Sequence, residues 1–255
     1  MMRLTFVLLA GAILVCLSRY IVPSWADLSE GGLVGYWRLD EAGGDRVLDA
    51  SGRGHDGALV GPVARVPGRV GQALSFRGEK GCGAVIADAP DLNPTTALTL
   101  EAWVKPEPLV REQTYEIINK AGDRGPGYRL FVSWAALRFV SGRGFGQDYW
   151  DVTASLAEHP MRSGLWHHLA AVYDGQTYYL YLDGIEVTTS RNLYHEKATL
   201  PLDGSTHPIT VSKTPLTIGS FQGGYAYPFL GAIDEVKIYN RAKTAEEVFQ
   251  DAKER

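Results

Sequence analysis

Acidic side chains gather in one stretch of the N-terminal third, where their chemistry suits a hard metal ion. Asp40, Glu41, Asp49 and Asp56 lie close together in the sequence, and the turn that begins at Asp49 adds backbone carbonyls at glycines. Ca²⁺ takes about six to eight oxygen ligands in flexible loops of this kind. The stretch therefore predicts a calcium site that includes Asp40 and Asp49, with Glu41 behind them. The alternative is that Asp49 and Asp56 only form turns by hydrogen-bonding to their own backbone.

A second group of side chains has the chemistry of sugar recognition. Flat aromatic faces and convergent polar groups bind sugars in shallow grooves. The segments Arg143–Asp151 and Gln222–Tyr227 combine such residues with glycines that let the backbone approach a ligand. The expected ligand-binding residues are Phe145, Tyr149, Trp150, Tyr225 and Tyr227. The alternative for Trp150 and Tyr227 is that they pack over sheet edges.

The other titratable residues do not form a catalytic pattern. Glycoside hydrolysis needs two carboxylates about 5–10 Å apart across the sugar bond, and no strand alternates Glu and Asp on one face in that way. Asp234 and Glu235 are adjacent in the sequence, so on a strand they should point to opposite faces. His167 and His168 should diverge for the same reason, and we expect them to be structural. Motifs of serine hydrolases and zinc proteases are absent, so we expect no enzymatic activity.

Short β-prone runs alternate with Gly, Pro, Asn and Asp from Leu33 onward, which is typical of an all-β sandwich. Strands are predicted at Leu33–Leu39, Ala73–Phe76, Leu98–Val104, Glu116–Lys120, Tyr128–Val132, Leu137–Val140, Trp166–Tyr173, Tyr178–Leu182, Ile185–Thr189, Leu216–Ile218 and Leu230–Tyr239. Asp183-Gly184 predicts a tight hairpin turn. Thr244 and Glu247 have capping-box spacing and predict a short helix over residues 245–253. We interpret Arg191–Thr214 as a long surface excursion.

The N-terminus has the pattern of an export signal. Leu4–Leu17 is an uncharged apolar run between Arg3 and Arg19, shorter than the roughly 20 residues that a membrane span needs. Ser24 and Ala26 are the small residues that a signal peptidase requires, so the sequence predicts a signal peptide over residues 1–26 and a secreted or periplasmic protein. The alternative is an uncleaved membrane anchor over residues 4–22, which would be the chain's only membrane contact.

Charge and cysteine content exclude further classes. The formal net charge is −4, and loss of Arg3 and Arg19 with the signal would make it −6 (−4 − 2). No cluster of Lys and Arg is present, which disfavours nucleic acid as a partner. Cys16 would also leave with the signal, so Cys82 could form no internal disulfide.

Seven motifs occur in a characteristic order along the chain. They are Gly35–Glu41 (GYWRLDE), Asp49–Gly57 (DASGRGHDG), Gly71–Phe76 (GQALSF), Leu98–Pro106 (LTLEAWVKP), Trp166–Ala170 (WHHLA), Tyr181–Gly184 (YLDG) and Gly231–Asn240 (GAIDEVKIYN). Together they resemble the laminin-G-like domains of the concanavalin A-like lectin/glucanase superfamily, over about residues 31–253.

The resemblance implies a fold, a ligand class and a further metal ligand. The implied fold is a jelly roll of two antiparallel sheets. A structural calcium commonly ties the early strand of such domains to the last one, and Asp234 stands at the matching position of the last strand. The implied function is non-catalytic recognition, with a glycan as the leading ligand. The alternatives are a protein-interaction or structural module of an envelope or extracellular assembly, and, less favoured, a glycoside hydrolase.

Overall fold

The computed structural model describes residues 31–254 apart from 123–124, 143–148, 196–197 and 201–208. These residues belong to one compact unit that begins at Gly31. The predicted signal peptide, residues 1–26, lies outside the described residues.

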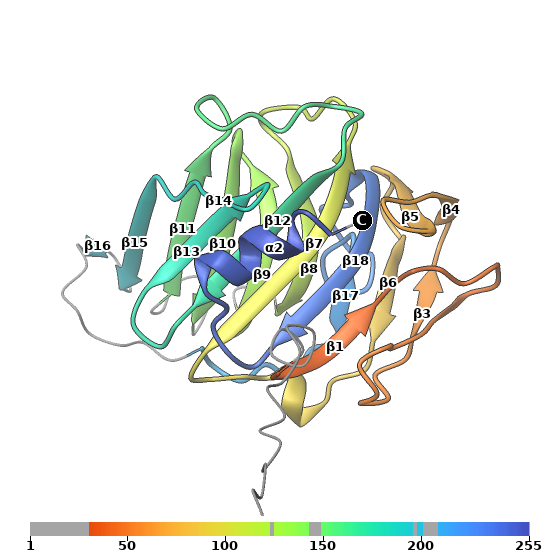
Figure 1. The fold of residues 1–255 in the computed structure, drawn as a ribbon, viewed down its shortest axis with the longest axis horizontal. Helices are drawn as coiled ribbons and strands as arrows, with labels where there is room; N and C mark the ends of the chain where they lie inside the picture. Colours follow the sequence, from red (N-terminus) through yellow and green to blue (C-terminus); the bar gives the residue numbers. More distant parts are fainter. Residues whose placement is uncertain (1–30, 123–124, 143–148, 196–197, 201–208, 255) are drawn as a thin grey trace, which may run out of the picture. The chain divides into compact units, whose positions relative to one another are not determined.

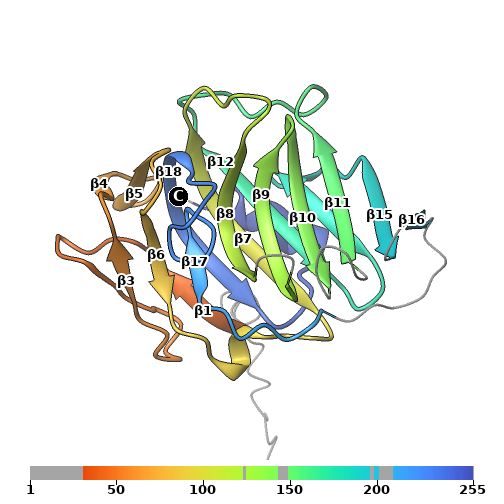
Figure 2. The same cartoon turned by 180° about the vertical axis from the view of Figure 1, so that it is seen from behind.

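Two antiparallel sheets form a sandwich (Figures 1 and 2). The eight-stranded sheet has the order β14-β13-β12-β7-β18-β5-β4, and β1 also pairs with β18. Its strands are β1 (Leu33–Trp37), β4 (Ala64–Pro67), β5 (Gln72–Arg77), β7 (Leu98–Pro106), β12 (His167–Tyr173), β13 (Tyr178–Leu182), β14 (Ile185–Glu186) and β18 (Leu230–Tyr239). The jelly-roll sandwich inferred from the sequence is confirmed.

The ten-stranded sheet has the order β16-β15-β11-β10-β9-β8-β17-β6-β3-β2. Its strands are β2 (Arg46–Val47), β3 (Gly57–Val60), β6 (Gly83–Ile86), β8 (Thr114–Ala121), β9 (Gly127–Ser133), β10 (Ala136–Gly142), β11 (Tyr149–Ser155), β15 (Ser190–His195), β16 (Ala198–Leu200) and β17 (Leu216–Ile218). A short 3₁₀ helix, η1 (Pro90–Leu92), precedes β7. The expectation of a loop over Arg191–Thr214 is wrong for β15 and β16, which extend the sheet beyond β11.

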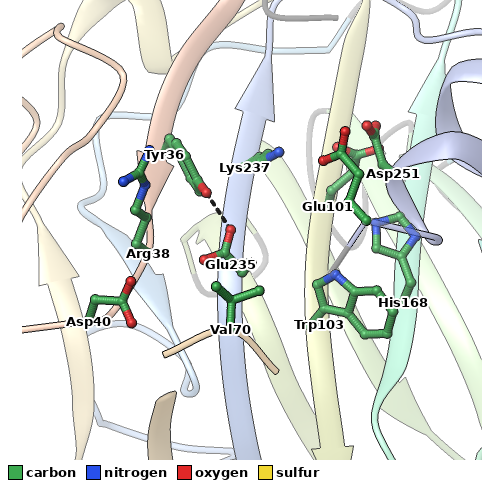
Figure 3. A pocket seen from close by; sticks show the side chains of 11 residues that line it. Tyr36, Arg38, Asp40, Val70, Glu101, Trp103, His168, Glu235, Lys237 and Asp251 are labelled. Atoms are coloured by element: carbon green, nitrogen blue, oxygen red, sulfur yellow. Dashed lines mark hydrogen bonds between the residues drawn. The ribbon is translucent and has the colours of Figure 1, made fainter. Parts of the chain in front are cut away.

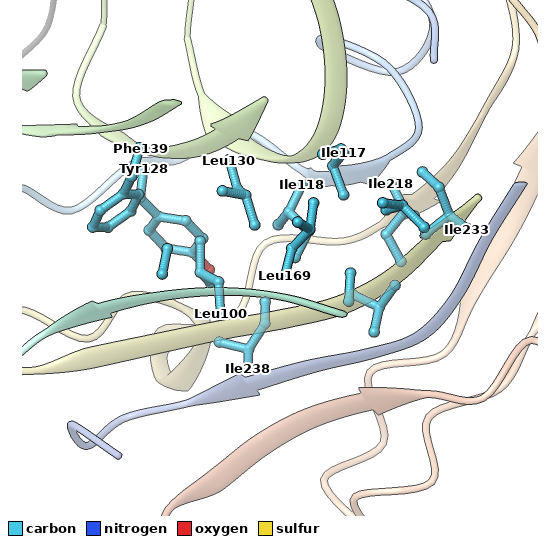
Figure 4. Close-up of a cluster of buried hydrophobic side chains, with 14 of the residues drawn as sticks. Leu100, Ile117, Ile118, Tyr128, Leu130, Phe139, Leu169, Ile218, Ile233 and Ile238 are labelled. Carbon is cyan, nitrogen blue, oxygen red and sulfur yellow. The ribbon is translucent and has the colours of Figure 1, made fainter. Parts of the chain in front are cut away.

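Alternation along the strands places the core between the two sheets. Leu100, Leu169 and Ile238 from the eight-stranded sheet face Leu130 and Phe139 from the ten-stranded sheet (Figure 4). β7 and β12 alternate regularly, because the core residues of each strand stand at every second position. Burial of these apolar side chains is the main term that stabilises the sandwich.

The predicted hairpin is also present. Leu182 pairs with Ile185, and Asp183 and Gly184 both adopt positive φ angles, 53° and 80°. This is the backbone conformation that a tight two-residue hairpin turn requires.

The C-terminal helix α2 (Ala245–Asp251) covers part of the outer face of the eight-stranded sheet (Figure 1). Both hydrogen bonds of the capping box at Thr244 and Glu247 are present, and Val248 packs with Ala170, Val172 and Tyr181 in a small second apolar cluster. Helix α2 therefore forms one wall of that outer face. Among the described residues, no helix has the length and apolar character to span a membrane.

Candidate functional site

Asp49 holds the turn that follows β2. Its carboxylate accepts hydrogen bonds from the amides of Tyr36, Ser51 and His55 at 2.9–3.0 Å, and from the Ser51 hydroxyl at 2.8 Å. Burial alone would raise the pKa of Asp49, but these hydrogen bonds outweigh it and hold the pKa below its usual range. The side chain acts here as a turn former, which is the alternative to a metal ligand.

Asp40 and Glu41 are engaged in a similar way. Glu41 forms an ion pair with Arg65 at 2.7 Å and accepts a 2.6 Å hydrogen bond from the Leu48 amide. Asp40 accepts a 2.7 Å hydrogen bond from the Gln72 amide. Both carboxylates therefore fasten the segment after β1 to neighbouring strands.

Asp234 fastens the turn between β4 and β5 to the last strand. One of its oxygens accepts hydrogen bonds from the amides of Arg69 at 2.8 Å and Val70 at 3.1 Å. Burial raises the pKa of Asp234 to about 7, although these hydrogen bonds oppose the shift.

The four residues expected to bind calcium do not converge on one point. Within the described ranges, no group of three or more His, Cys, Asp or Glu side chains is arranged to hold a metal ion. The donor set therefore does not fit a Ca²⁺ ion, which needs about six or more oxygens around it. Calcium binding itself stays a prediction.

Asp234 and Glu235 do not point to opposite faces, so that expectation is wrong. The register of β18 against β7 shifts between Asp234 and Lys237, and Glu235 has a φ of 52°. These features mark a β-bulge, which inserts one extra residue and breaks the alternation. Ile233 and Val236 both lie in the core, so the two acidic residues between them share the outer face.

The two adjacent histidines do diverge. His167 is held between the Asp183 carboxylate, 2.8 Å from Nδ1, and the Arg162 amide, which donates to Nε2 at 2.8 Å. His168 lies on the outer face against Trp103, with ring centroids 5.3 Å apart.

The aromatic residues expected to bind a ligand separate into three groups. Trp150 lies in the core, 1% exposed, and packs on Tyr178, so its assignment to a binding face is wrong. Tyr225 and Tyr227 are 75% and 45% exposed, and Tyr149 is half-buried on the outer face of the ten-stranded sheet. Phe145 lies outside the described residues.

Charged side chains that the sequence reasoning missed form two pairs on this outer face. Arg129 pairs with Glu116, and its guanidinium lies between the rings of Phe131 and Phe221, 4.4 and 4.8 Å from their centroids. The alternation along β9 could have revealed Arg129. Tyr128, Leu130 and Val132 lie in the core, which leaves Arg129 and Phe131 on the outer face.

The second pair stands one strand further along the same face. Arg138 on β10 contacts Asp151 on β11 through two nitrogens, and the Nε–Oδ1 distance is 3.0 Å. Such two-point contacts fix the geometry of both side chains. We call the outer surface of β8–β11, together with Phe221 and Tyr227, the aromatic-charge face.

A turn holds Tyr227 at the edge of the aromatic-charge face. Phe221 and Ala226 pair through their backbones, the carbonyl of Tyr227 accepts a 2.9 Å hydrogen bond from the Glu116 amide, and its ring contacts Phe221 edge-on at 5.6 Å. The φ of Tyr227 is 52°, a left-handed conformation that is strained for a bulky side chain.

Comparison with known proteins identifies a relative of low sequence identity. Pappalysin-1 of Mus musculus is 25% identical over 214 residues, which is 75% of this chain but 12% of that protein. The chain thus spans about an eighth of this curated relative.

Solved structures show the same fold. The binding domain of Paraclostridial Mosquitocidal Protein 1 has a TM-score of 0.67 at 16% identity and covers 88% of this chain and 52% of that one. The receptor-binding domain of botulinum neurotoxin C/D mosaic serotype has a TM-score of 0.64 at 12% identity, with 88% and 51% covered. The binding domain of botulinum neurotoxin DC in complex with SialylT has a TM-score of 0.65 at 12% identity, with 88% and 52% covered.

The laminin-G-type family described as the concanavalin A-like lectin/glucanases superfamily matches residues 79–249. That match covers more than half of the 255 residues, and the chain therefore belongs to this family.

Proposed function

We propose that this protein is a non-catalytic recognition module and that its ligand is a carbohydrate bound on the aromatic-charge face. The name of the family to which the chain belongs refers to lectins and glucanases. Among the solved structures of similar fold, the binding domain of botulinum neurotoxin DC is in complex with SialylT in one structure and with rat synaptotagmin II in another. These likenesses support a binding role, and they leave a glycan and a protein partner as the two candidates.

The observation that carries the proposal is the exposed, strained Tyr227. A non-glycine residue at a φ of 52° costs of order 1–3 kcal/mol, and such strain gathers at ligand-binding sites. The turn keeps this ring about half exposed above the Arg129–Glu116 pair instead of burying it. An exposed aromatic face beside fixed polar groups is the usual composition of a sugar site.

The carboxylates of this face support a non-catalytic role. Glu116 and Asp151 are each paired with an arginine. Hydrolysis of a glycoside needs one carboxylic acid that gives up a proton and one carboxylate that attacks or activates water. Two carboxylates held by guanidinium groups are poor candidates for either role, so we expect no release of reducing ends from a polysaccharide panel.

A glycan array with four proteins tests the proposal. Wild type should bind a defined set of glycans, and Tyr227→Ala and Tyr149→Ala should lose at least tenfold in affinity. Ile185→Ala is the control, because it removes a 64% exposed side chain from the other sheet, and it should bind like wild type. Undiminished binding by both tyrosine variants would place the ligand elsewhere. A blank array, together with a partner recovered by crosslinking through Tyr227, would favour the protein-interaction role.

Calcium and export need separate measurements. Calorimetry with Ca²⁺ on chelator-stripped protein should give heat and a higher Tm if Asp40, Glu41, Asp49 and Asp234 rearrange around an ion, and neither effect if they only anchor loops. Mass spectrometry of the mature protein should find an N-terminus at Asp27 if the signal is cleaved. A membrane-bound form that retains residues 4–22 would support the anchor.

A further inference from the structure

A hollow lies on the outer face of the eight-stranded sheet, away from the aromatic-charge face. Its volume is about 250 Å³. Its walls come from β1, β7, β12, β18 and helix α2, which contribute Tyr36, Glu101, Trp103, His168, Glu235 and Asp251 (Figure 3). We call it the α2 pocket.

Two polar atoms in the α2 pocket are buried without a partner. Oε1 of Glu101 and Nδ1 of His168 form no hydrogen bond within the described part of the chain, and the two residues are 1% and 2% exposed. They lie on neighbouring strands, because His168 pairs with Trp103, two residues beyond Glu101 on the same face. A buried polar atom without a hydrogen bond costs about 1–3 kcal/mol, so both atoms favour a bound group that pairs with them.

The pocket has more acceptors than donors. Its lining contains five carboxylates (Asp40, Glu101, Glu235, Asp251 and Glu254) and two permanent cations (Arg38 and Lys237). Lys243 reaches Glu101 at 3.0 Å and also contacts Asp251. Even so, burial and the neighbouring Glu101 charge raise the pKa of Asp251, which indicates that its negative charge is incompletely balanced.

The aromatic faces of the pocket already hold cations. The Arg69 guanidinium lies 4.4 Å from the Trp103 ring centroid. Arg38 and Lys237 lie over the Tyr36 ring at 5.2 and 4.9 Å. A neutral sugar would normally stack on such faces, and here the protein's own side chains are in that position.

The groups of the pocket that remain available to a ligand are therefore carboxylate oxygens. Glu235 accepts a hydrogen bond from the Tyr36 hydroxyl with one oxygen, and its other oxygen has no hydrogen-bond partner among the described residues. Glu101 contributes its unpaired Oε1 from β7, and Asp251 lies next to it on α2 (Figure 3). An ammonium group has three donors and one positive charge, which matches a pocket whose lining has more acceptors than donors.

We propose that the α2 pocket binds a primary ammonium group of a small polar ligand, held by Glu101, Glu235 and Asp251. A metal ion does not fit, because these carboxylates are not arranged as metal ligands in the described structure. An amino sugar and a lysine side chain carry the same ammonium group, and the experiment distinguishes these two sources. The site does not depend on the function proposed for the aromatic-charge face.

Calorimetry with matched probes tests the charge requirement. Glucosamine, N-acetylglucosamine and glucose share one ring and differ at one position, and Nα-acetyl-lysine amide carries the ammonium group without a sugar. At least one of the two ammonium probes should bind at least tenfold more tightly than the neutral sugars. Binding of glucosamine alone identifies an amino sugar as the ligand class, and binding of lysine amide alone identifies a lysine side chain. Equal binding of N-acetylglucosamine and glucosamine, or no binding of either ammonium probe, would overturn the proposal.

Variants locate the binding. Glu235→Gln keeps an acceptor for the Tyr36 hydroxyl and should lower the affinity of the ammonium probe at least tenfold, as should Glu101→Gln. Because Glu101 also pairs with buried Lys243, Glu101→Gln can lose stability, and Glu235→Gln then decides the result. Glu158→Gln, an exposed residue after β11, is the control. Wild-type affinity in folded Glu235→Gln would refute the assignment.

The two proposed sites can fail independently. Tyr227→Ala should leave ammonium binding unchanged, and Glu235→Gln should leave the binding of glycans without a free amino group unchanged on the array.

Discussion

Buried His168 should make the protein lose stability in mild acid. Burial lowers the pKa of this imidazole from 6.5 to about 4, because the charged form loses its hydration among the walls of the α2 pocket. Between pH 6.5 and pH 4 the unfolded chain therefore binds a proton that the folded protein does not. The contribution of neutral His168 to the free energy of unfolding is fully present above pH 6.5, and it is lost as the pH falls from 6.5 to 4.

The size of the effect follows from the shift. One pKa unit corresponds to about 1.4 kcal/mol, so the lowered pKa of His168 accounts for about 3.4 kcal/mol over the full window and about 2.5 kcal/mol at pH 4.5. The charged groups around the imidazole act in both directions. Asp251 and Asp183 raise its pKa, and Lys243 and Lys237 lower it.

Urea unfolding at pH 7.0 and 4.5, followed by tryptophan fluorescence, measures this directly. Other groups also titrate in this range, so the informative quantity is the difference between wild type and His168→Phe. That difference should shift by about 2.5 kcal/mol in favour of the variant at pH 4.5. His159→Phe controls for the loss of an imidazole from a loop. Parallel pH profiles of wild type and His168→Phe would refute the reasoning and would mean that the imidazole is solvated in the folded protein.

Two further substitutions probe the elements that frame the sites. Thr244→Ala removes the N-cap of α2 and should lower the free energy of unfolding, measured by urea denaturation, by about 1 kcal/mol. An unchanged unfolding midpoint would mean that the capping box is not formed in solution. Gly219→Ala places a Cβ into the Phe76 ring at a φ of 80°, and it should cost more than about 1 kcal/mol and lower the Tm. A Tm equal to that of wild type would contradict the close packing of that turn against β5.

Local sequence signals predicted the parts of the fold that depend on few residues. The Asp183-Gly184 turn needs only two residues that accept positive φ, and the cap of α2 needs only Thr244 and Glu247. The alternation along β7 and β12 is equally local, because a strand that separates a core from an outer face repeats every two residues.

The orientation of Trp150 could not be predicted from the local sequence pattern. Tyr149 and Trp150 are adjacent aromatic residues, and the sequence does not say which of them faces the core. Their orientation follows from the register of β11 on β10, where Trp150 pairs with Ser141. Ser141 points inward and donates to the Tyr178 hydroxyl at 2.8 Å, so its partner Trp150 is also inside. Such pairing joins distant residues, and a shift of one residue would exchange the two rings.

The bulge in β18 could have been predicted from the sequence, and it determines which residues line the α2 pocket. Ile233, Val236 and Ile238 are the core residues of this strand, and the step of three between Ile233 and Val236 breaks the two-residue period. In a strand such a step indicates one extra residue between two buried positions. Without it, Glu235 would face the core and could not remain charged. The extra residue therefore brings Glu235 to the outer face, where it lines the α2 pocket together with Glu101. The acceptors of the pocket thus depend on a bulge that a strict alternation would exclude.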